Sequence, residues 1–433
     1  MIGFALLILA GTGLLLLPVS IAGSGRTPLI DALFTATSAT CVTGLVIYDT
    51  ARYWSLFGQA IILILIQIGG MGVVTMAVAI TAFSGKRIGL RQRCIMQEAI
   101  AAPQVGGIVR MTGFIVKTTF IFEMMGTLLF SLRFCPLLGF WRGLWYAVFH
   151  SVSAFCNAGF DLMGRLMPFS SLMDFACDPL VNGITMVLII LGGIGFLTWA
   201  DIREHKWHLH AYKLQSKIIL TTTAALLVLP AVVLFFYEFS LPNWRGMSLE
   251  ERLLAALFQS VTPRTAGFNT VDLMKMSQPS QLMILLLMLT GGAPGSTAGG
   301  FKVTTLAVLL LSIRAVFHRK ESGHCFGRRI APEVLRSAVA IFFLYILLFL
   351  TGGMLLSAIE GIPILTALFE AASAIGTVGL SLGITSALSL PSKLILIFLM
   401  YFGRVGGLTM VYAVLSGGVT IPAKLPQEKV TVG

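Results

Sequence analysis

The stretch SATCVTGL, residues 38–45, decides the fold because its pattern recurs three more times. The full copies read DALFTATSATCVTGL (31–45), YAVFHSVSAFCNAGF (146–160), LAALFQSVTPRTAGF (254–268) and TALFEAASAIGTVGL (366–380). Each has a Phe, a helical run of small residues with Ser or Thr, a break, and a glycine before a large apolar residue. The glycines Gly44, Gly159, Gly267 and Gly379 follow at intervals of 115, 108 and 112 residues, which predicts a fourfold internal repeat. The third copy is one residue shorter between Phe258 and Gly267 than the others are from their Phe to their Gly, so we expect approximate symmetry.

The composition around these copies is typical of a membrane protein. Of the 433 residues, 57% are hydrophobic and 11% are charged, against roughly 25% charged in a soluble chain. The mean hydropathy of +0.92 excludes a soluble enzyme. The net charge of +12 comes from short basic runs between apolar stretches, so we expect no nucleic-acid partner.

Eight apolar runs are long enough to cross about 30 Å of hydrocarbon. They lie near residues 2–22, 54–83, 111–133, 180–200, 216–239, 281–316, 338–359 and 392–416. The first run lacks the basic start and the cleavage site of a signal peptide, so a span is the better interpretation. The runs pair into repeats at 1–83, 84–200, 201–316 and 317–433, with pore loops at 28–45, 143–160, 251–268 and 363–380.

The short helix of each repeat is too short to span. Residues 29–39 would form a helix about 16 Å long, which reaches halfway through the hydrocarbon and must re-enter. Because each repeat crosses twice, all four loops enter from one face, which disfavours an inverted-repeat transporter. The sequence therefore predicts an all-α integral membrane protein, with eight spans in four tandem span–pore loop–span repeats and pseudo-fourfold symmetry around a central pore.

The orientation follows from the basic loops. Residues 84–93, 203–217 and 314–329 hold four, four and five Lys or Arg and should face the cytosol. We expect a multi-pass protein of the cell membrane, in contact with lipid, with both termini cytosolic. Acidic residues flank the opposite side and act either as caps and solvated loop residues or as a cation-concentrating mouth: Asp31, Asp49, Asp161, Asp174, Asp178 and Asp272.

The breaks after the four short helices are candidate ion-selectivity filters. Helix C-termini and free carbonyl oxygens at an axis favour cations, and glycine tolerates the backbone that a narrow carbonyl-lined path requires. The alternative is that the glycines are only tight turns. The candidate filter residues are Val42, Thr43, Gly44, Asn157, Ala158, Gly159, Thr265, Ala266, Gly267, Thr377, Val378 and Gly379.

Over essentially its whole length the chain resembles the ion-translocating subunit of the Trk/Ktr/HKT potassium transporters, most closely the Ktr type. The matching strings include SATCVTGL, SAFCNAGF, VTPRTAGFN and SAIGTVGL, with LIQIGGMG, LGGIGF, GGAPGSTAGGFKVTT and YFGRVGGLT. The resemblance implies potassium uptake. In that family a serine in the first loop accompanies sodium preference, so Gly44 implies potassium at the filter carbonyls. Channel and carrier modes both stay open, as does sodium as an activator or coupled ion.

The same resemblance implies partners. It suggests a homodimer docked on a cytosolic ring of nucleotide-binding regulatory subunits with Rossmann-like domains. The contacts would come from the basic inner loops, including 84–110 and 203–217, and from the tail after Gly417. No cofactor is expected in this chain, and no catalytic constellation marks an enzyme. The alternative function is a secondary transporter of another cation or small solute.

The run 281–316 is too long to cross once and must break at GGAPGSTAGG. A P-loop is excluded because Phe301 separates Gly300 from Lys302 and no strand precedes. A structural kink is one interpretation, and the resemblance implies a gate under the filter. The gate residues would be Gly291, Gly292, Ala293, Pro294, Gly295, Ser296, Thr297, Ala298, Gly299, Gly300 and Arg404.

Several polar residues fall within the apolar runs. Arg404 lies inside the last span, where a cation is costly. The resemblance places it in the pore below the filter, and the alternatives are snorkelling or pairing with Glu123 or Glu370. We expect Arg264 to anchor the third loop.

The remaining polar candidates have structural interpretations. We expect Glu370 to hold a pore helix and His150 to be a polar pore-helix residue, not a metal ligand. Lys302 could simply reach cytosolic water. The six cysteines read as free thiols, with a Cys135–Cys177 disulfide as the alternative.

Overall fold

The structure, a computed structural model, describes residues 2–73, 75–76, 108–164, 167–320 and 323–406. Cys94, most of the inner loop predicted at 84–110, the predicted span ends at 83 and 416, and the tail after Gly417 lie outside the described residues. The described chain is mostly helical and falls into four successive units. Each unit has a first helix, a shorter helix that ends in a non-helical loop, and a further helix.

The first two units have these elements. Unit 1 comprises α1 (Ile2–Leu15), η1 (Pro18–Ser20), α2 (Leu29–Thr40), α3 (Thr50–Tyr53) and α4 (Leu56–Met71). Unit 2 comprises α7 (Ile108–Leu138), α8 (Phe140–Phe155), η2 (Met173–Phe175), α9 (Pro179–Gly193), α10 (Phe196–His205) and η3 (Leu209–Ala211).

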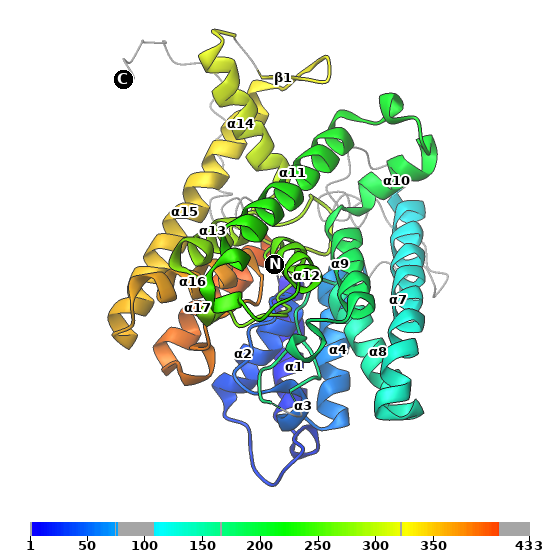
Figure 1. Ribbon diagram of the computed structural model, residues 1–433, viewed down its shortest axis with the longest axis vertical. Helices are drawn as coiled ribbons and strands as arrows, with labels where there is room; N and C mark the ends of the chain where they lie inside the picture. Colours follow the sequence, from blue (N-terminus) through cyan, green and yellow to red (C-terminus); the bar gives the residue numbers. More distant parts are fainter. Residues whose placement is uncertain (1, 74, 77–107, 165–166, 321–322, 407–433) are drawn as a thin grey trace.

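The last two units follow the same order. Unit 3 comprises α11 (Leu214–Phe236), η4 (Glu238–Ser240), η5 (Pro242–Trp244), α12 (Leu249–Val261), η6 (Leu273–Lys275), α13 (Gln278–Met288) and α14 (Val303–Phe317). A hairpin of β1 (His324–Cys325) and β2 (Arg328–Arg329) precedes unit 4, which comprises α15 (Pro332–Glu360), α16 (Ile364–Gly376), η7 (Thr385–Ala387) and α17 (Leu390–Val405). Figure 1 shows this hairpin projecting with α14 beyond most of the other helices.

Not every predicted span is one long helix. Within the described residues, three helices are long and apolar enough to cross a membrane alone: α7, α11 and α15. The pair α9 and α10 would make a fourth, but it bends by 93°, a break that the sequence pattern did not predict. The run 281–316 is interrupted between Met288 and Val303. The count of eight spans therefore stays a prediction.

A polar contact joins the end of the first helix to the start of the helix after the loop in every unit. The backbone NH of Ser55 donates to Ser20 O at 2.9 Å in unit 1, and Arg133 Nε lies 2.6 Å from Asp178 Oδ2 in unit 2. In units 3 and 4 a glutamate accepts from a serine hydroxyl, at 2.6 Å each: Ser277 to Glu238 and Ser389 to Glu360. These contacts hold each unit as a hairpin, with the loop between its arms.

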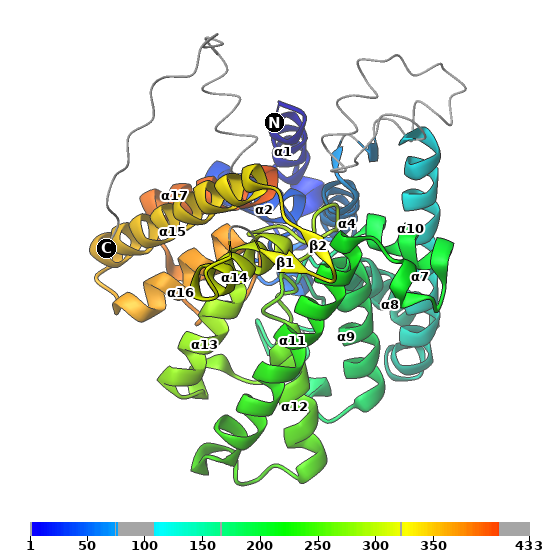
Figure 2. The ribbon, with the colours of Figure 1, turned by 90° about the horizontal axis from the view of Figure 1, so that it is seen from above.

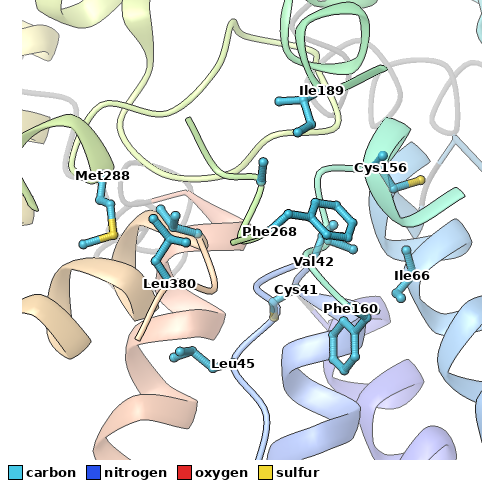
Figure 3. Packing of buried hydrophobic residues seen from close by; sticks show 14 of the residues in the cluster. Cys41, Val42, Leu45, Ile66, Cys156, Phe160, Ile189, Phe268, Met288 and Leu380 are labelled. Atoms are coloured by element: carbon cyan, nitrogen blue, oxygen red, sulfur yellow. The ribbon is translucent and has the colours of Figure 1, made fainter. Parts of the chain in front are cut away.

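The units follow one another around a common centre. In Figure 2 the colours run in sequence order, from α1 and α2 past α7 to α9, then α11 and α12, to α15, α16 and α17. The last helix, α17, packs against α2 of the first unit and closes the arrangement. The four loops meet in the buried core between the units, where Leu45, Phe160, Phe268 and Leu380 belong to one apolar cluster (Figure 3).

Candidate functional site

The four glycines that end the repeated motif lie next to one another. A Cβ built on Gly44 would lie 3.1 Å from the Cα of Gly159, and one on Gly159 would lie 2.9 Å from the Cα of Gly267. A Cβ on Gly267 would lie 3.2 Å from the Cα of Gly379, and one on Gly379 would lie 3.0 Å from the Cα of Gly44. The contacts close a ring in which a side chain would collide with the neighbouring loop. We call these four residues the glycine ring.

Each loop of the ring has the same backbone conformation. In the first loop φ is 57° at Val42 and 90° at Gly44, while Thr43 between them is outside the left-handed region. The pattern recurs at Asn157 (58°) and Gly159 (68°), Thr265 (64°) and Gly267 (80°), and Thr377 (51°) and Gly379 (95°). A positive φ costs a non-glycine residue of order 1–3 kcal/mol and persists only where the surroundings impose it.

A hydroxyl residue near the end of each short helix holds the loop by its amide groups. Ser38 accepts from Thr43 N at its carbonyl (2.8 Å) and from Gly44 N at its hydroxyl (3.1 Å). Ser373 does the same in unit 4, at 2.8 and 3.0 Å. In unit 2, Ser153 O accepts from Ala158 N at 2.8 Å. In unit 3, whose motif is one residue shorter, the acceptor is four residues back instead of five, with Ala266 N donating to Thr262 O at 3.0 Å.

The carbonyl groups of the same loops are left free. Within the described ranges, the carbonyl oxygens of the twelve predicted filter residues accept no hydrogen bond from the protein. Those residues are nevertheless buried, at 0–1% exposure where a value is given. Buried carbonyl oxygens are normally bonded, so the free carbonyl oxygens of four adjacent loops are suited to coordinate a cation.

A cavity of about 170 Å³ opens onto the ring from the side of the segments that follow the glycines. All four ring glycines line it, together with the carboxylates of Asp49 and Asp161. The Asp49 carboxylate accepts hydrogen bonds from backbone amides, including that of Phe169 at 2.8 Å. Asp161 lies outside the spanning helices. Its burial, and secondarily the Asp49 carboxylate, raise its pKa to about 7.

The loop 291–300 folds back on itself and touches two other units. The two ends of the loop are joined by a hydrogen bond from Gly291 N to Phe301 O at 2.7 Å. The hydroxyl of Thr297 donates to Phe155 O, the last residue of α8, at 3.0 Å. Gly300 N donates to Gly403 O of α17 at 3.2 Å. The loop is therefore anchored to the end of one loop-bearing helix and to the last helix of the chain.

Arg404 joins this loop to the first unit. Its guanidinium donates to the carbonyl oxygens of Thr297 and Gly69, and to that of Gly70 at 3.1 Å. The two acids weighed as partners are engaged elsewhere. Glu123 accepts from Gln67 at 3.1 Å, and Glu370 accepts from the hydroxyl of Thr385. The alternative that Arg404 pairs with either acid is wrong, because its guanidinium bonds backbone carbonyls instead.

Sequence reasoning missed one set of residues at this level. A Cβ on Gly69, Gly192 or Gly403 would collide with the carbonyl oxygen of Thr40, Phe155 or Ile375, each at the end of the short helix of the same unit. The signal was visible as GGMG (69–72), GGIG (192–195), GGAPG (291–295) and GRVG (403–406). In this alignment Arg404 stands where the other units have a second glycine. The final glycines of three copies, Gly72, Gly195 and Gly406, have φ of 87°, 93° and 92° and end or bend the helix.

The other polar residues singled out from the sequence have defined partners. Arg264 donates to Thr223 of α11 at 3.3 and 3.4 Å, behind the third loop. Lys302 donates to Ala298 O at 2.8 Å and Gly299 O at 3.2 Å, so it turns into the loop 291–300 and not toward cytosolic water. His150 contacts Tyr146 O through Nδ1, and its Nε2 accepts from a backbone amide.

The cysteines and one polar group on α10 do not form part of the ring. The five described cysteines, including Cys135 and Cys177, are free thiols. Asp201, Glu204 and His205 bring ligand atoms within 4.8 Å of one another. The Asp201 carboxylate, however, accepts from Lys213 N at 2.9 Å and lies 3.0 Å from His205, so it has a structural role in joining α10 to α11.

Apolar helices around a ring of carbonyl-bearing loops define a class of protein, the membrane-embedded ion transporters. The family model for TrkH, a cation transport protein, matches residues 9–417. The chain belongs to this Trk/Ktr family, and it is an ion transporter and not an enzyme.

The individual matches agree with that family. The chain is 38% identical to the potassium/sodium uptake protein NtpJ of Enterococcus hirae, over 100% of this chain and 96% of the relative. It is 40% identical to the Ktr system potassium uptake protein B of Bacillus subtilis, over 95% and 91%. The crystal structure of the potassium transporter TrkH from Vibrio parahaemolyticus matches with a TM-score of 0.74 at 22% identity, over 96% of this chain and 83% of that one. This last match supports the fold alone.

Proposed function

We propose that the protein takes up potassium across the cell membrane, with the glycine ring as its selectivity filter. The observation that carries this proposal is the closed ring of four glycines, in loops whose carbonyl oxygens accept no hydrogen bond from the described protein. Such oxygens replace the water shell of a dehydrated alkali cation. Potassium is the ion because the relatives are named for potassium uptake, and because a glycine stands at the ring position of every loop, the first included.

The loop 291–300 and Arg404 act as the gate of this filter. The support is that Arg404 bonds the loop at Thr297 and unit 1 at Gly70. A fixed positive charge raises the barrier for a cation. Opening would require the guanidinium to leave these carbonyls, or the loop to move with it.

Regulation comes from outside the chain. We expect a homodimer on a ring of cytosolic nucleotide-binding subunits with Rossmann-like domains, since three relatives are named as parts of a Ktr system. The inner loops, including 84–110 and 203–217, and the tail after Gly417 would provide the contacts. Both termini would then be cytosolic. Sodium acts as activator or coupled ion, in keeping with the name of the relative from Enterococcus hirae.

The test is growth of a potassium-transport-deficient cell at limiting potassium, with the chain expressed together with the regulatory subunit of a Ktr system. The matched comparison is between Gly44→Ser, in the glycine ring, and Gly183→Ser, outside it. Loss of rescue in Arg264→Ala or Thr223→Ala at equal membrane abundance would say nothing about the filter. Gly183 has no neighbour within 4 Å of a Cβ. Absence of rescue by wild type at normal membrane abundance would refute potassium uptake.

A further inference from the structure

One ion pair in the described chain joins two different units. Lys393 Nζ of α17 lies 2.7 Å from Asp31 Oδ1 of α2, and the two side chains are 13% and 6% exposed. The other ion pairs in the described ranges, such as Arg133–Asp178, lie within one unit or one inner loop. This pair bridges residues 362 positions apart.

The second oxygen of Asp31 is also used. The hydroxyl of Tyr48 donates to Asp31 Oδ2 at 2.7 Å. Tyr48 follows the ring glycine Gly44 by four residues, and its ring stacks on Tyr53 at 3.9 Å. One carboxylate in the first turn of α2 therefore ties the helix that enters the first loop to the segment that leaves it. Lys393 adds the last helix of the chain to that tie.

The equivalent positions in the other units are neutral. Lys393 is the fourth residue of α17, counted from the start of the helix at Leu390. The fourth residue of the corresponding helix in units 1, 2 and 3 is Gln59, Asn182 and Gln281. Gln59 accepts from Trp145 of unit 2 at 3.0 Å, while Asn182 and Gln281 bond backbone carbonyls of their own units. Units 1 and 2, 2 and 3, and 3 and 4 are each joined by the chain itself. The boundary between units 4 and 1 has no such link, and the ion pair lies there.

Lys393 and Arg404 lie at opposite ends of α17. They are eleven residues apart, which is about three helical turns and about 16 Å, so both project from the same face. Lys393 contacts α2 and Arg404 contacts the end of α4, and both of these belong to unit 1. The two cations thus fix the rotation and the height of α17 against the first unit.

We infer that Asp31, Tyr48 and Lys393 form a latch that closes the ring between the last and first units and positions both the first filter loop and Arg404. These are positioning residues, and the inference rests on the proposed function. Without the latch, α17 and α2 separate at their outer ends, the first loop loses its register with the fourth, and the ring discriminates ions less well.

The test uses Asp31→Asn, Lys393→Gln and the exchanged pair Asp31→Lys with Lys393→Asp, as full-length protein reconstituted in liposomes. Each single variant should lower the potassium-to-sodium flux ratio by about five-fold or more, and the exchanged pair should recover most of it. The matched control is Lys275→Gln, which removes a lysine 3.9 Å from Asp272 in an exposed pair within one unit. It should leave the ratio unchanged.

Two outcomes would overturn the latch: single variants that keep the wild-type ratio, or an exchanged pair no better than either single change. Should the single variants fail to accumulate, two milder variants make the same comparison. Tyr48→Phe removes one hydroxyl and should lower the potassium-to-sodium flux ratio. Lys393→Arg keeps the charge and should leave the ratio near normal. A double-mutant cycle on the thermal unfolding midpoint reports the pair without any transport. A wild-type chain that moves no potassium yet shows coupling in that cycle would refute the proposed function and retain the latch.

Discussion

The guanidinium of Arg404 donates a hydrogen bond to the carbonyl oxygen of Gly70, 3.1 Å away, and Arg404 occupies in unit 4 the position that Gly70 occupies in unit 1. Three copies of the motif leave this position without a side chain, and the fourth fills it with a cation. One charged residue therefore stands at this position, and the three equivalent positions have glycine. Under the proposed function this charge forms a barrier, while all four candidate filter loops keep their glycine.

Replacing Arg404 by Ala should raise basal potassium flux, because the barrier charge and its bonds to Thr297 and Gly70 are lost together. Arg404→Lys keeps the charge but reaches fewer carbonyls, so its basal flux should lie between those of the wild type and Arg404→Ala. Flux into liposomes without the regulatory subunit is the measurement, and exposed Arg245→Ala is the control. Equal or lower flux in Arg404→Ala at normal abundance would give Arg404 a purely structural role.

Gly44→Ser should lower the potassium-to-sodium flux ratio by about ten-fold, because the new Cβ collides with the second loop and the carbonyl ring is displaced. The left-handed backbone at φ 90° adds strain. Competitive uptake of the two ions measures the ratio. Gly183→Ser, in open surroundings, should behave as wild type. An unchanged ratio in Gly44→Ser would exclude the first loop from the filter.

Gly192→Ala should destabilise the protein by about 1–3 kcal/mol. Its Cβ would collide with Phe155 O and lie 2.8 Å from the hydroxyl of Thr297, which joins the loop 291–300 to α8. Gly183→Ala, nine residues earlier on α9, meets nothing and should be neutral or slightly stabilising because alanine favours helix. Thermal unfolding in detergent compares the two. Equal midpoints would show that the close approach at Gly192 is readily relieved.

Potassium uptake at limiting concentration should fall as the external pH drops through about 7. Burial raises the pKa of Asp161 to about 7, so a lower pH adds the proton and removes a negative charge from the cavity above the ring. Asp161→Asn should abolish this pH dependence and stay at the low rate throughout. Exposed Asp174→Asn, which does not line the cavity, should retain it. A pH profile unaltered by Asp161→Asn would assign the dependence to another group.

Shortening the loop 291–300 by two residues should also raise basal flux. The loop reaches Phe155, Gly403 and Arg404 at once, and a shorter segment cannot keep all three contacts. Liposome flux at matched protein amounts is the measurement. Lower flux with a normal unfolding midpoint would contradict a gating role for this segment.

The sequence predicted the loops of the glycine ring better than it predicted the breaks in the helices below them. The strings that end in Gly44, Gly159, Gly267 and Gly379 identified the loops, because a local pattern of small residues, a break and a glycine repeats at nearly constant spacing. The interruption of the third unit's last helix was also predictable from its glycines and Pro294. The same information was present in the glycines at 69–72 and 192–195, yet the 93° bend between α9 and α10 was not predicted. Those runs are apolar enough to read as continuous spans.

By itself, the sequence determined that this is a membrane protein, and it predicted four repeated segments as the candidate functional loops, since hydropathy, repeat spacing and glycine placement are local properties of the chain. Only the tertiary structure decided which units meet and which partners the buried charges find. Lys393 pairs with Asp31, 362 positions away in the sequence. Arg404 bonds backbone carbonyls instead of Glu123 or Glu370. Such pairings depend on how helices distant in sequence pack, and every residue has a backbone carbonyl, so the order of the amino acids does not show which one accepts a hydrogen bond from a buried arginine.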